Sequence, residues 1–215
     1  MTVLFLLLLL GLSVPAYAED SAPETGTWHF DEDRPEQLPP KFAIGTFFDG
    51  RPAGDWKVIT TPKALSPPNV FAQLREKGAD YNVVLIEDTT TMDLDLSVSF
   101  LPISGKADMG GGLIWRAKDD RNYYLIRANP LEQNIRLYHV VKGIRKMLKN
   151  YDEIIDIKTW HRLHVVNQGC RIQIFHDEKP IVDLCDETFK GGRIGLWTKS
   201  DAVTYFDDLR LQILP

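Results

Sequence analysis

The sequence lacks an excess of basic residues. It contains 25 Lys and Arg against 30 Asp and Glu, which gives a formal net charge of -5 at pH 7. The basic residues are scattered along the chain and form no cluster. Binding to nucleic acid or to an anionic membrane surface depends on concentrated positive charge. We therefore expect neither of these partners.

Long apolar runs are missing after the first eighteen residues, MTVLFLLLLLGLSVPAYA. This stretch combines an apolar run with a small-residue ending at Ala16, Tyr17 and Ala18, which is typical of a cleavable secretory signal. It is too short to cross roughly 30 Å of hydrocarbon. No Lys or Arg precedes it, so the natural start could lie upstream. The sequence predicts a signal peptide over residues 1–18, no membrane span after cleavage, and a periplasmic or secreted location.

The remaining chain has no linker that would divide it. Residues 19–40 are acidic and rich in proline, and they are interpreted as a segment that leads into the domain, with TWHF as a candidate edge strand. Residues 41–215 are long enough to bury a core of their own. We expect a single β-sandwich domain over this range.

Cysteine is scarce: only Cys170 and Cys185 are present. An exported chain can keep a disulfide between them. A two-residue turn at Asp177 and Glu178 would place the cysteines opposite each other. A three-residue loop ending at Lys179 would pair more apolar side chains and send the cysteines to opposite faces. The sequence favours the second register on packing, and the disulfide stays an open alternative.

Catalytic motifs are also missing. The E-x-D-x-x-E carboxylate motif of one glycosidase family is absent, as are serine and cysteine nucleophile signatures and glycine-rich phosphate loops. The carboxylates of the DLD stretch, Asp93 to Asp95, are expected at a solvated edge. Whether the chain is an enzyme is left open, with Asp207 and Asp208 as the candidate catalytic residues.

No metal site is expected from the histidines. His161 and His164 would point to opposite faces of one strand, while His29, His139 and His176 have no partner at ligand spacing. No cofactor is expected. Ca²⁺ is kept as an alternative at three acidic turn residues, although such turns are mostly solvated: Asp119, Asp120 and Asp201.

What the sequence does contain is a series of short runs with alternating apolar residues between turn signals. Eleven such runs and no long amphipathic helix predict an all-β sandwich. One stretch, NVFAQLREKG, fits a helix or a strand. The last strand needs a bulge at Asp207 and Asp208, because Phe206 and Leu209 both favour the core but differ in parity.

Residues 111–143 predict three neighbouring strands that each carry one arginine, Arg116, Arg127 or Arg136. Alternation assigns all three to the same face, together with Tyr138. Like charges on strands about 4.8 Å apart repel each other unless carboxylates, water or an anion separate them. The arginines are either a solvated surface with local ion pairs or a binding face.

Three segments together resemble a known family: GGLIWRAKDDRNYYLIRANPLEQNIRLYHVVKG, WHRLHVV and GGRIGLWTKSDAVTYFDDLRL. They are similar to the concanavalin A-like lectin/glucanase sandwiches of exported bacterial proteins. Within that group they look closest to laminin-G-like and glycoside-hydrolase-16-like domains, whose relatives include 3-keto-disaccharide hydrolases. The resemblance covers roughly residues 40–213 and implies a jelly roll of two curved antiparallel sheets.

The resemblance also implies positions for two residues. Arg116 matches an arginine that relatives place on the concave face after an Asn-Ser-Gly motif, but here the preceding segment MGGGLIW lacks Asn-Ser. Trp197 stands where relatives have a polar concave-face residue, and Lys199 shares its face by parity. These departures indicate a different ligand, or none.

The leading hypothesis is an exported, carbohydrate-associated sandwich that acts as a binding or accessory module. Its basic and aromatic concave face would favour a glycan with carboxylate or sulfate groups. The alternatives are a glycoside or 3-keto-glycoside hydrolase, in which Asp207 or Asp208 works with Arg116, and a structural or protein-interaction domain of the cell envelope. The predicted ligand-binding residues are Arg116, Arg127, Arg136, Tyr138, Trp197 and Lys199.

Overall fold

The computed structural model describes residues 25–47 and 49–215. The predicted signal peptide over residues 1–18 lies outside them. Within the described ranges, no helix has the length and apolar character that crossing a bilayer requires.

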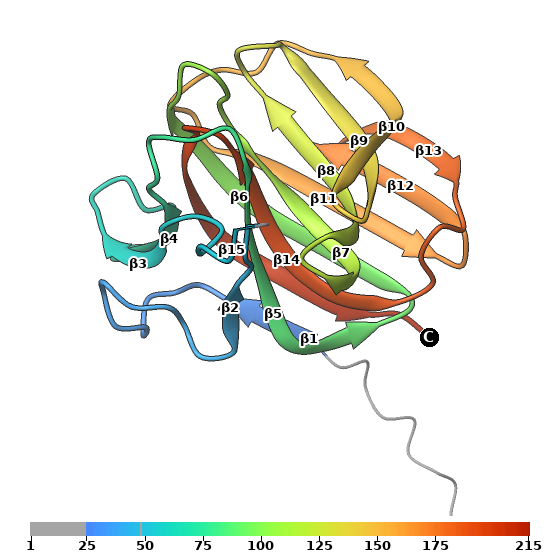
Figure 1. Ribbon diagram of the computed structural model, residues 1–215, viewed down its shortest axis with the longest axis horizontal. Coiled ribbons are helices and arrows are strands. Elements are labelled where there is room, and N and C mark those ends of the chain that lie inside the picture. Colours follow the sequence, from blue (N-terminus) through green and yellow to red (C-terminus); the bar gives the residue numbers. More distant parts are fainter. Residues whose placement is uncertain (1–24, 48) are drawn as a thin grey trace, which may run out of the picture.

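The described residues form fifteen β-strands and no helix. Figure 1 shows them as two layers of curved, antiparallel strands. The strands are β1 Thr25–Trp28, β2 Phe42–Ile44, β3 Trp56–Thr60, β4 Asn69–Gln73, β5 Tyr81–Thr91, β6 Leu94–Ser104, β7 Gly111–Asp119, β8 Asn122–Asn129, β9 Asn134–Val141, β10 Ile144–Asp152, β11 His161–Gln168, β12 Arg171–His176, β13 Lys179–Cys185, β14 Gly192–Lys199 and β15 Val203–Ile213.

The two layers are an eight-stranded and a seven-stranded sheet. The order of the first is β13-β12-β11-β6-β15-β4-β3, with β1 also pairing with β15. The order of the second is β10-β9-β8-β7-β14-β5-β2. The predicted all-β sandwich of two antiparallel sheets is therefore confirmed.

Two apolar clusters flank the seven-stranded sheet. The larger fills the space between the sheets and includes Phe71, Trp115 and Phe206. The smaller lies on the outer face of the seven-stranded sheet, where Phe47 and Ala53, from the connection between β2 and β3, are part of it. Strands that are buried on both faces lose strict alternation of apolar and polar residues, as β7 and β8 show.

Strand β4 resolves an alternative that the sequence left open, and strand β10 is an element that the sequence analysis did not predict. The stretch NVFAQ is strand β4, so the helical alternative is excluded. Strand β10 was not predicted, because its sequence IRKMLKNYD is rich in lysine and lacks alternation. It lies at an edge, where lysines discourage pairing with another sheet.

The bulge predicted in the last strand is present. The register of β15 against β6 shifts between Asp207 and Arg210, and Asp208 has a φ of 49°. The shift lets both Phe206 and Leu209 reach the core, as their burial requires.

Cys170 and Cys185 form a disulfide with their Cα atoms 4.8 Å apart. The sequence argument that the better-packed register separates them is wrong. Asp177 and Glu178 make a two-residue turn with positive φ, and a register shift between Ile174 and Phe175 restores the pairing of Ile172 with Leu184. Cys170 belongs to the turn before β12, outside the strand alternation, and so it can reach Cys185.

Candidate functional site

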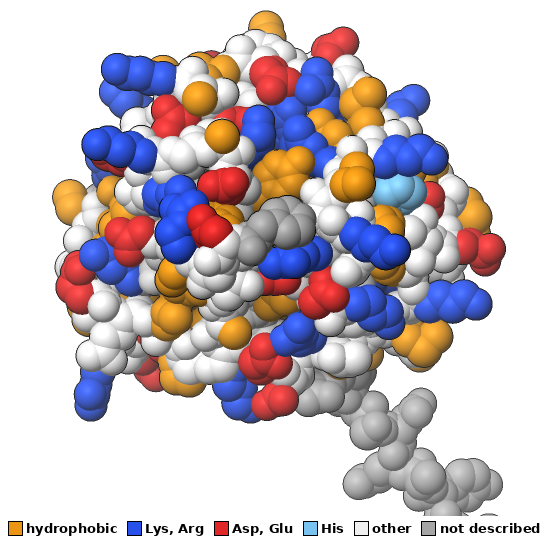
Figure 2. All heavy atoms as spheres, in the orientation of Figure 1, with side chains coloured by type: hydrophobic (Ala, Val, Ile, Leu, Met, Phe, Trp, Pro, Cys, Tyr) orange, Lys and Arg blue, Asp and Glu red, His pale blue; other side chains and the backbone are white. Residues whose placement is uncertain are grey.

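The candidate site lies on the outer face of the seven-stranded sheet, which faces away from the other sheet. Figure 2 shows Lys and Arg side chains gathered over an apolar area near the centre of this side of the molecule. A cavity of about 300 Å³ opens beside Lys199. Its other walls come from segment 45–54, the start of β5 and the turns after β7 and β9, and its lining includes Phe47, Tyr81, Asp120 and Gly143.

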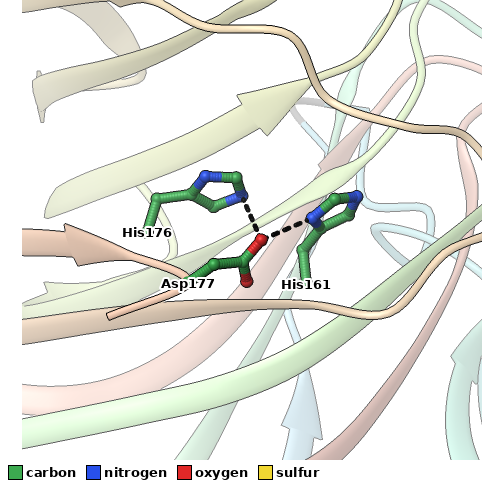
Figure 3. Close-up of side chains that lie close together, drawn as sticks. All are labelled: His161, His176 and Asp177. Carbon is green, nitrogen blue, oxygen red and sulfur yellow. Dashed lines mark hydrogen bonds and ion pairs between the residues drawn. The ribbon is translucent and has the colours of Figure 1, made fainter. Parts of the chain in front are cut away.

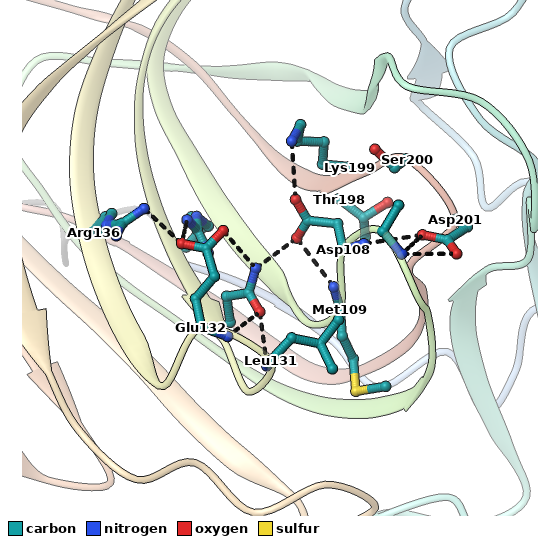
Figure 4. Close-up of polar contacts among 12 residues, drawn as sticks. Asp108, Met109, Leu131, Glu132, Arg136, Thr198, Lys199, Ser200 and Asp201 are labelled. Atoms are coloured by element: carbon teal, nitrogen blue, oxygen red, sulfur yellow. Dashed lines mark hydrogen bonds and ion pairs between the residues drawn. The ribbon is translucent and has the colours of Figure 1, made fainter.

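A continuous polar network crosses this face from β9 to β14. Arg136 Nη1 donates to Glu132 Oε2 at 2.6 Å, and Asn129 Nδ2 lies 3.4 Å from Glu132 Oε1. The same Asn129 nitrogen donates to Asp108 Oδ1 at 2.8 Å, and Asp108 Oδ2 lies 3.2 Å from Lys199 Nζ. Figure 4 shows Arg136, Glu132, Asp108 and Lys199 in this order across the sheet. Donors and acceptors therefore alternate along one line.

Arg127 lies buried beneath this network and contacts it through Glu132. It is paired with Arg136 in the register of β8 and β9, and its side chain is only 2% exposed. Its Nη2 donates to Glu132 Oε2 at 3.0 Å, so one carboxylate separates the two guanidinium groups. Among the described residues, its Nε and Nη1 atoms are buried without a hydrogen-bond partner.

The two carboxylates of the network have pKa values shifted in opposite directions. Burial raises the pKa of Asp108, and this effect outweighs the positive charges of Arg127 and Lys199. Partial burial also acts to raise the pKa of Glu132, but hydrogen bonding and the charge of Arg127 outweigh it and lower the pKa. Glu132 therefore holds its negative charge more firmly than Asp108 does.

Arg145 on β10 was missed by sequence reasoning, because β10 itself was not recognised. Its guanidinium carbon lies 4.3 Å from the centre of the Tyr138 ring and 5.8 Å from that of Trp197. Such contacts are attractive cation–π interactions. The face therefore carries one more cation than the sequence indicated.

Trp197 lies on the predicted face but is covered. It is 1% exposed and packs beside Tyr81, with ring centres 5.4 Å apart. Its ring is therefore part of the apolar cluster on this face and not an exposed surface for a ligand. Tyr138 is also largely buried, which leaves Arg136 and Lys199 as the more accessible of the predicted residues.

The prediction that Arg116 shares this face is wrong. A register shift of β7 at Arg116, whose φ is 48°, breaks the alternation. The side chain instead bonds four acceptors in turns at one end of the sandwich, at 2.7 to 3.0 Å: Met92 O, Phe189 O, Asp93 Oδ1 and Gly169 O. Asp93, expected at a solvated edge, is its ion-pair partner. Arg116 is thus a buried structural residue.

Asp207 and Asp208 do not join Arg116. Asp207 is fully buried and accepts hydrogen bonds from the backbone of Leu65 and Ser66 and from the Ser66 hydroxyl. Asp208 Oδ1 lies 2.6 Å from His29 Nδ1. Both belong to the eight-stranded sheet, so the predicted catalytic pairing with Arg116 has no geometric basis.

The acidic turn residues bind backbone groups. Asp201 accepts N–H bonds from three successive residues, 106 to 108. Asp119 accepts from Arg121 N, and Asp120 accepts from Thr46 N. Asp201 and Asp120 thus each join two segments that are distant in sequence, whereas Asp119 stabilises its own turn.

The histidines are arranged differently from the expectation. His161 and His164 do face opposite ways, since His161 is buried beside Phe100 while His164 stacks on Phe175. The view that His176 has no partner is wrong. It stacks on His161 with ring centres 5.2 Å apart, because β11 and β12 are adjacent.

Comparison with known proteins gives one sequence relative and several related structures. No protein-family model matches the chain. Levanase of Bacillus subtilis (strain 168) is 25% identical to it over 160 residues, which make up 73% of this chain. The chain spans only 21% of the length of that levanase.

Two solved structures show the same fold. A carbohydrate-binding module, CBM66 of Bacillus subtilis, gives a TM-score of 0.66 at 18% identity and covers 80% of this chain and 95% of the module. The GH43 protein BlXynB of Bacillus licheniformis gives a TM-score of 0.61 at 13% identity and covers 94% of this chain and 41% of that protein. These likenesses confirm the expected concanavalin A-like sandwich.

Proposed function

We propose that this chain is a carbohydrate-binding β-sandwich whose ligand lies against the outer face of the seven-stranded sheet. The observation that carries the proposal is the line of alternating hydrogen-bond donors and acceptors from Arg136 through Glu132, Asn129 and Asp108 to Lys199. Sugar hydroxyls both donate and accept hydrogen bonds, so neighbouring hydroxyls match such a line. The cavity beside Lys199 offers room next to it.

Similarity to carbohydrate proteins supports the same proposal. The CBM66 module is a carbohydrate-binding module by name, and the chain covers 95% of it. The levanase match adds sequence similarity to an enzyme named for levan. A fold alone does not fix a function, and therefore the proposal depends on the polar network as well.

The ion pairs already present on this face favour a neutral sugar over an anionic one. Glu132 lies between Arg127 and Arg136, and Asp108 faces Lys199, so these cations already have counter-charges. A sulfate or carboxylate on the ligand would compete with Glu132 and Asp108 and be repelled by them. Hydroxyl recognition is accordingly proposed in place of charge recognition.

The proposal is tested by measuring binding to levan, to other neutral polysaccharides and to sulfated ones with the purified chain. We expect Arg136→Ala and Lys199→Ala each to weaken binding of the neutral ligand about tenfold, because each removes a charged hydrogen-bond group. Arg171→Ala is the matched control, since this arginine pairs with Asp183 on the other sheet.

Two results would contradict the proposed binding face. One is that no polysaccharide in the panel binds. Another is that Arg171→Ala weakens binding as much as Arg136→Ala. Preferential binding of a sulfated ligand would instead contradict the assignment of a neutral sugar while leaving the binding face in place.

A second candidate function is hydrolysis of a glycoside. The opposite pKa shifts of Asp108 and Glu132 are the arrangement expected for an acid and a base. Against it, both oxygens of Asp108 are occupied, by Asn129, Met109 N and Lys199. Release of reducing sugar that stops in Asp108→Asn and Glu132→Gln would establish the enzyme. Release that persists in both variants would exclude Asp108 and Glu132 as its catalytic acid and base.

We also propose that the chain functions outside the cytoplasm, in the periplasm or as a secreted protein. The disulfide between Cys170 and Cys185 supports this, because disulfides persist mainly in oxidising compartments. Fractionation of cells that express the chain tests the location directly, and recovery of a reduced protein from the cytoplasm would contradict it.

A further inference from the structure

His161, His176 and Asp177 form a compact cluster away from the proposed sugar face. Their ligand atoms all lie within 4.8 Å of one another. Figure 3 shows both imidazole rings directed at the Asp177 carboxylate. His161 Nδ1 is 2.8 Å and His176 Nε2 is 3.6 Å from Asp177 Oδ2. The residues come from β11, the end of β12 and the turn that follows it.

In each histidine, the ring nitrogen that faces away from Asp177 (the outer nitrogen) is fixed as a hydrogen-bond donor. His161 Nε2 lies 2.9 Å from the carbonyl oxygen of Asp156, which can only accept a hydrogen bond. His176 Nδ1 lies 2.8 Å from Glu153 Oε2, and Lys179 pairs with the other oxygen of that carboxylate. Both outer nitrogens therefore carry the ring hydrogen when the imidazoles are neutral.

The other two ring nitrogens, His161 Nδ1 and His176 Nε2, are then hydrogen-bond acceptors when the rings are neutral. Both face Asp177 Oδ2, which is also an acceptor, so three lone pairs point at one another. His176 is 4% exposed, and its Nε2 has no hydrogen-bond partner among the described residues. A buried acceptor without a donor is costly, and a cation placed between the three atoms removes the cost.

The geometry points to a binding site for a divalent transition metal of the Zn²⁺ class, held by His161 Nδ1, His176 Nε2 and Asp177 Oδ2. Imidazole and carboxylate ligands lie about 2.0–2.2 Å from Zn²⁺, which places two tetrahedral ligands about 3.4 Å apart. The distances of 2.8 and 3.6 Å from Asp177 Oδ2 to the two imidazoles lie on either side of this separation, whereas the three ligand atoms together spread over up to 4.8 Å. Binding of the ion therefore requires the two imidazole rings to move closer together.

The surroundings match those of known metal sites. Metal-bound histidines usually donate their second N–H to a carboxylate or a backbone carbonyl, as His176 and His161 do here to Glu153 and Asp156. The Asp177 side chain is half exposed, which leaves an approach for the ion and room for a water ligand. The other oxygen of Asp177 is held by Arg162 N–H at 2.7 Å.

The test is titration of the untagged, EDTA-treated chain with Zn²⁺ alone, followed by calorimetry, and with Co²⁺ alone, followed by visible absorption. We expect one ion per chain and a Co²⁺ spectrum of four-coordinate intensity. His176→Gln and Asp177→Asn should abolish both signals. Glu153→Gln should weaken Zn²⁺ binding about 10- to 100-fold, because it no longer orients His176 as a carboxylate does.

The matched control is His164→Gln, since His164 lies on the same strand but faces away and pairs with Asp95. It should bind Zn²⁺ as the unmodified chain does. Asp177→Asn keeps the acceptor for Arg162 N–H, so it tests the site even if His176→Gln does not fold. Absence of saturable Zn²⁺ binding, or equal binding by Asp177→Asn and the unmodified chain, would overturn the proposal and leave a proton as the shared cation.

Discussion

At the scale of single residues, the surroundings of an arginine decide what it does. Arg116, Arg127 and Arg136 appear equivalent in sequence, yet Arg116 bonds four acceptors in buried turns while Arg136 is accessible at the edge of a polar network. Alternation of side chains along a strand assigns each residue to a face only while the strand is regular. The bulge at Arg116 interrupts β7, so alternation assigned Arg116 to the wrong face.

Replacing Arg116 by methionine is expected to destabilise the fold without changing sugar binding. The substitution keeps much of the side-chain length but leaves Asp93 and three carbonyl groups without their donor. Loss of one partner of a buried ion pair costs roughly 3–5 kcal/mol. Urea unfolding measures the change, and Arg171→Met, which alters an exposed pair, should shift the midpoint far less. Equal shifts would show that Arg116 has no special structural role.

Asp201 gives a prediction for pH. Partial burial acts to raise its pKa, but the three backbone N–H donors outweigh this and hold the pKa below its ordinary value of 3.8. A carboxyl group with a lowered pKa in the folded state stabilises the fold above its unfolded pKa, and this stabilisation is lost as the pH falls through the folded pKa. The difference in thermal midpoint between the unmodified chain and Asp201→Asn should therefore be largest near pH 7 and shrink below pH 3.8. A difference that is constant down to pH 2 would contradict this assignment.

At the scale of elements, turns and strand pairing brought together residues that the alternation along single strands had assigned to different places. The hairpin of β12 and β13 has a two-residue turn and a register shift, and the disulfide depends on both. The same hairpin turn carries Asp177 to the two histidines. Sequence patterns identified these strands, but the pairing of β11 with β12 was needed to place His161 beside His176.

Removal of the disulfide in the double variant Cys170→Ala and Cys185→Ala should lower the free energy of unfolding by about 3 kcal/mol. The bridge closes a loop with a sequence separation of 15, and chain-entropy estimates for such a loop give this magnitude. Guanidinium unfolding of the oxidised protein, the reduced protein and the double variant measures it. The last two should agree with each other, and an unchanged midpoint in both would contradict the prediction.

At the scale of the whole molecule, the segment before residue 41 belongs to the packed structure. Strand β1 pairs with β15 through residues 25–28, and Phe30 is buried beside Phe42 and Phe71. The domain that the sequence predicted over residues 41–215 would lack these contacts. Phe30 thus contributes to the core between the two sheets.

A chain that starts at residue 41 is therefore expected to be less stable than one that starts at residue 25. Burial of a phenylalanine side chain alone contributes about 1.5–3 kcal/mol, and the loss of β1 also exposes the edge of β15. Thermal unfolding and sedimentation of the two chains, prepared in parallel, measure stability and aggregation. Equal midpoints for both chains would contradict this expectation and support residue 41 as the start of the domain.

The sequence by itself determined the sandwich, the strand-rich core and the bulge in β15, because alternation of apolar residues is a local property that reports which face is buried. It also placed Arg136 and Lys199 on the outer face correctly. Tertiary structure decided the rest. A register shift turned Arg116 inward, Tyr81 and Arg145 packed against Trp197, and adjacent strands joined His161 to His176. These outcomes depend on contacts between residues far apart in the chain, which no local pattern records.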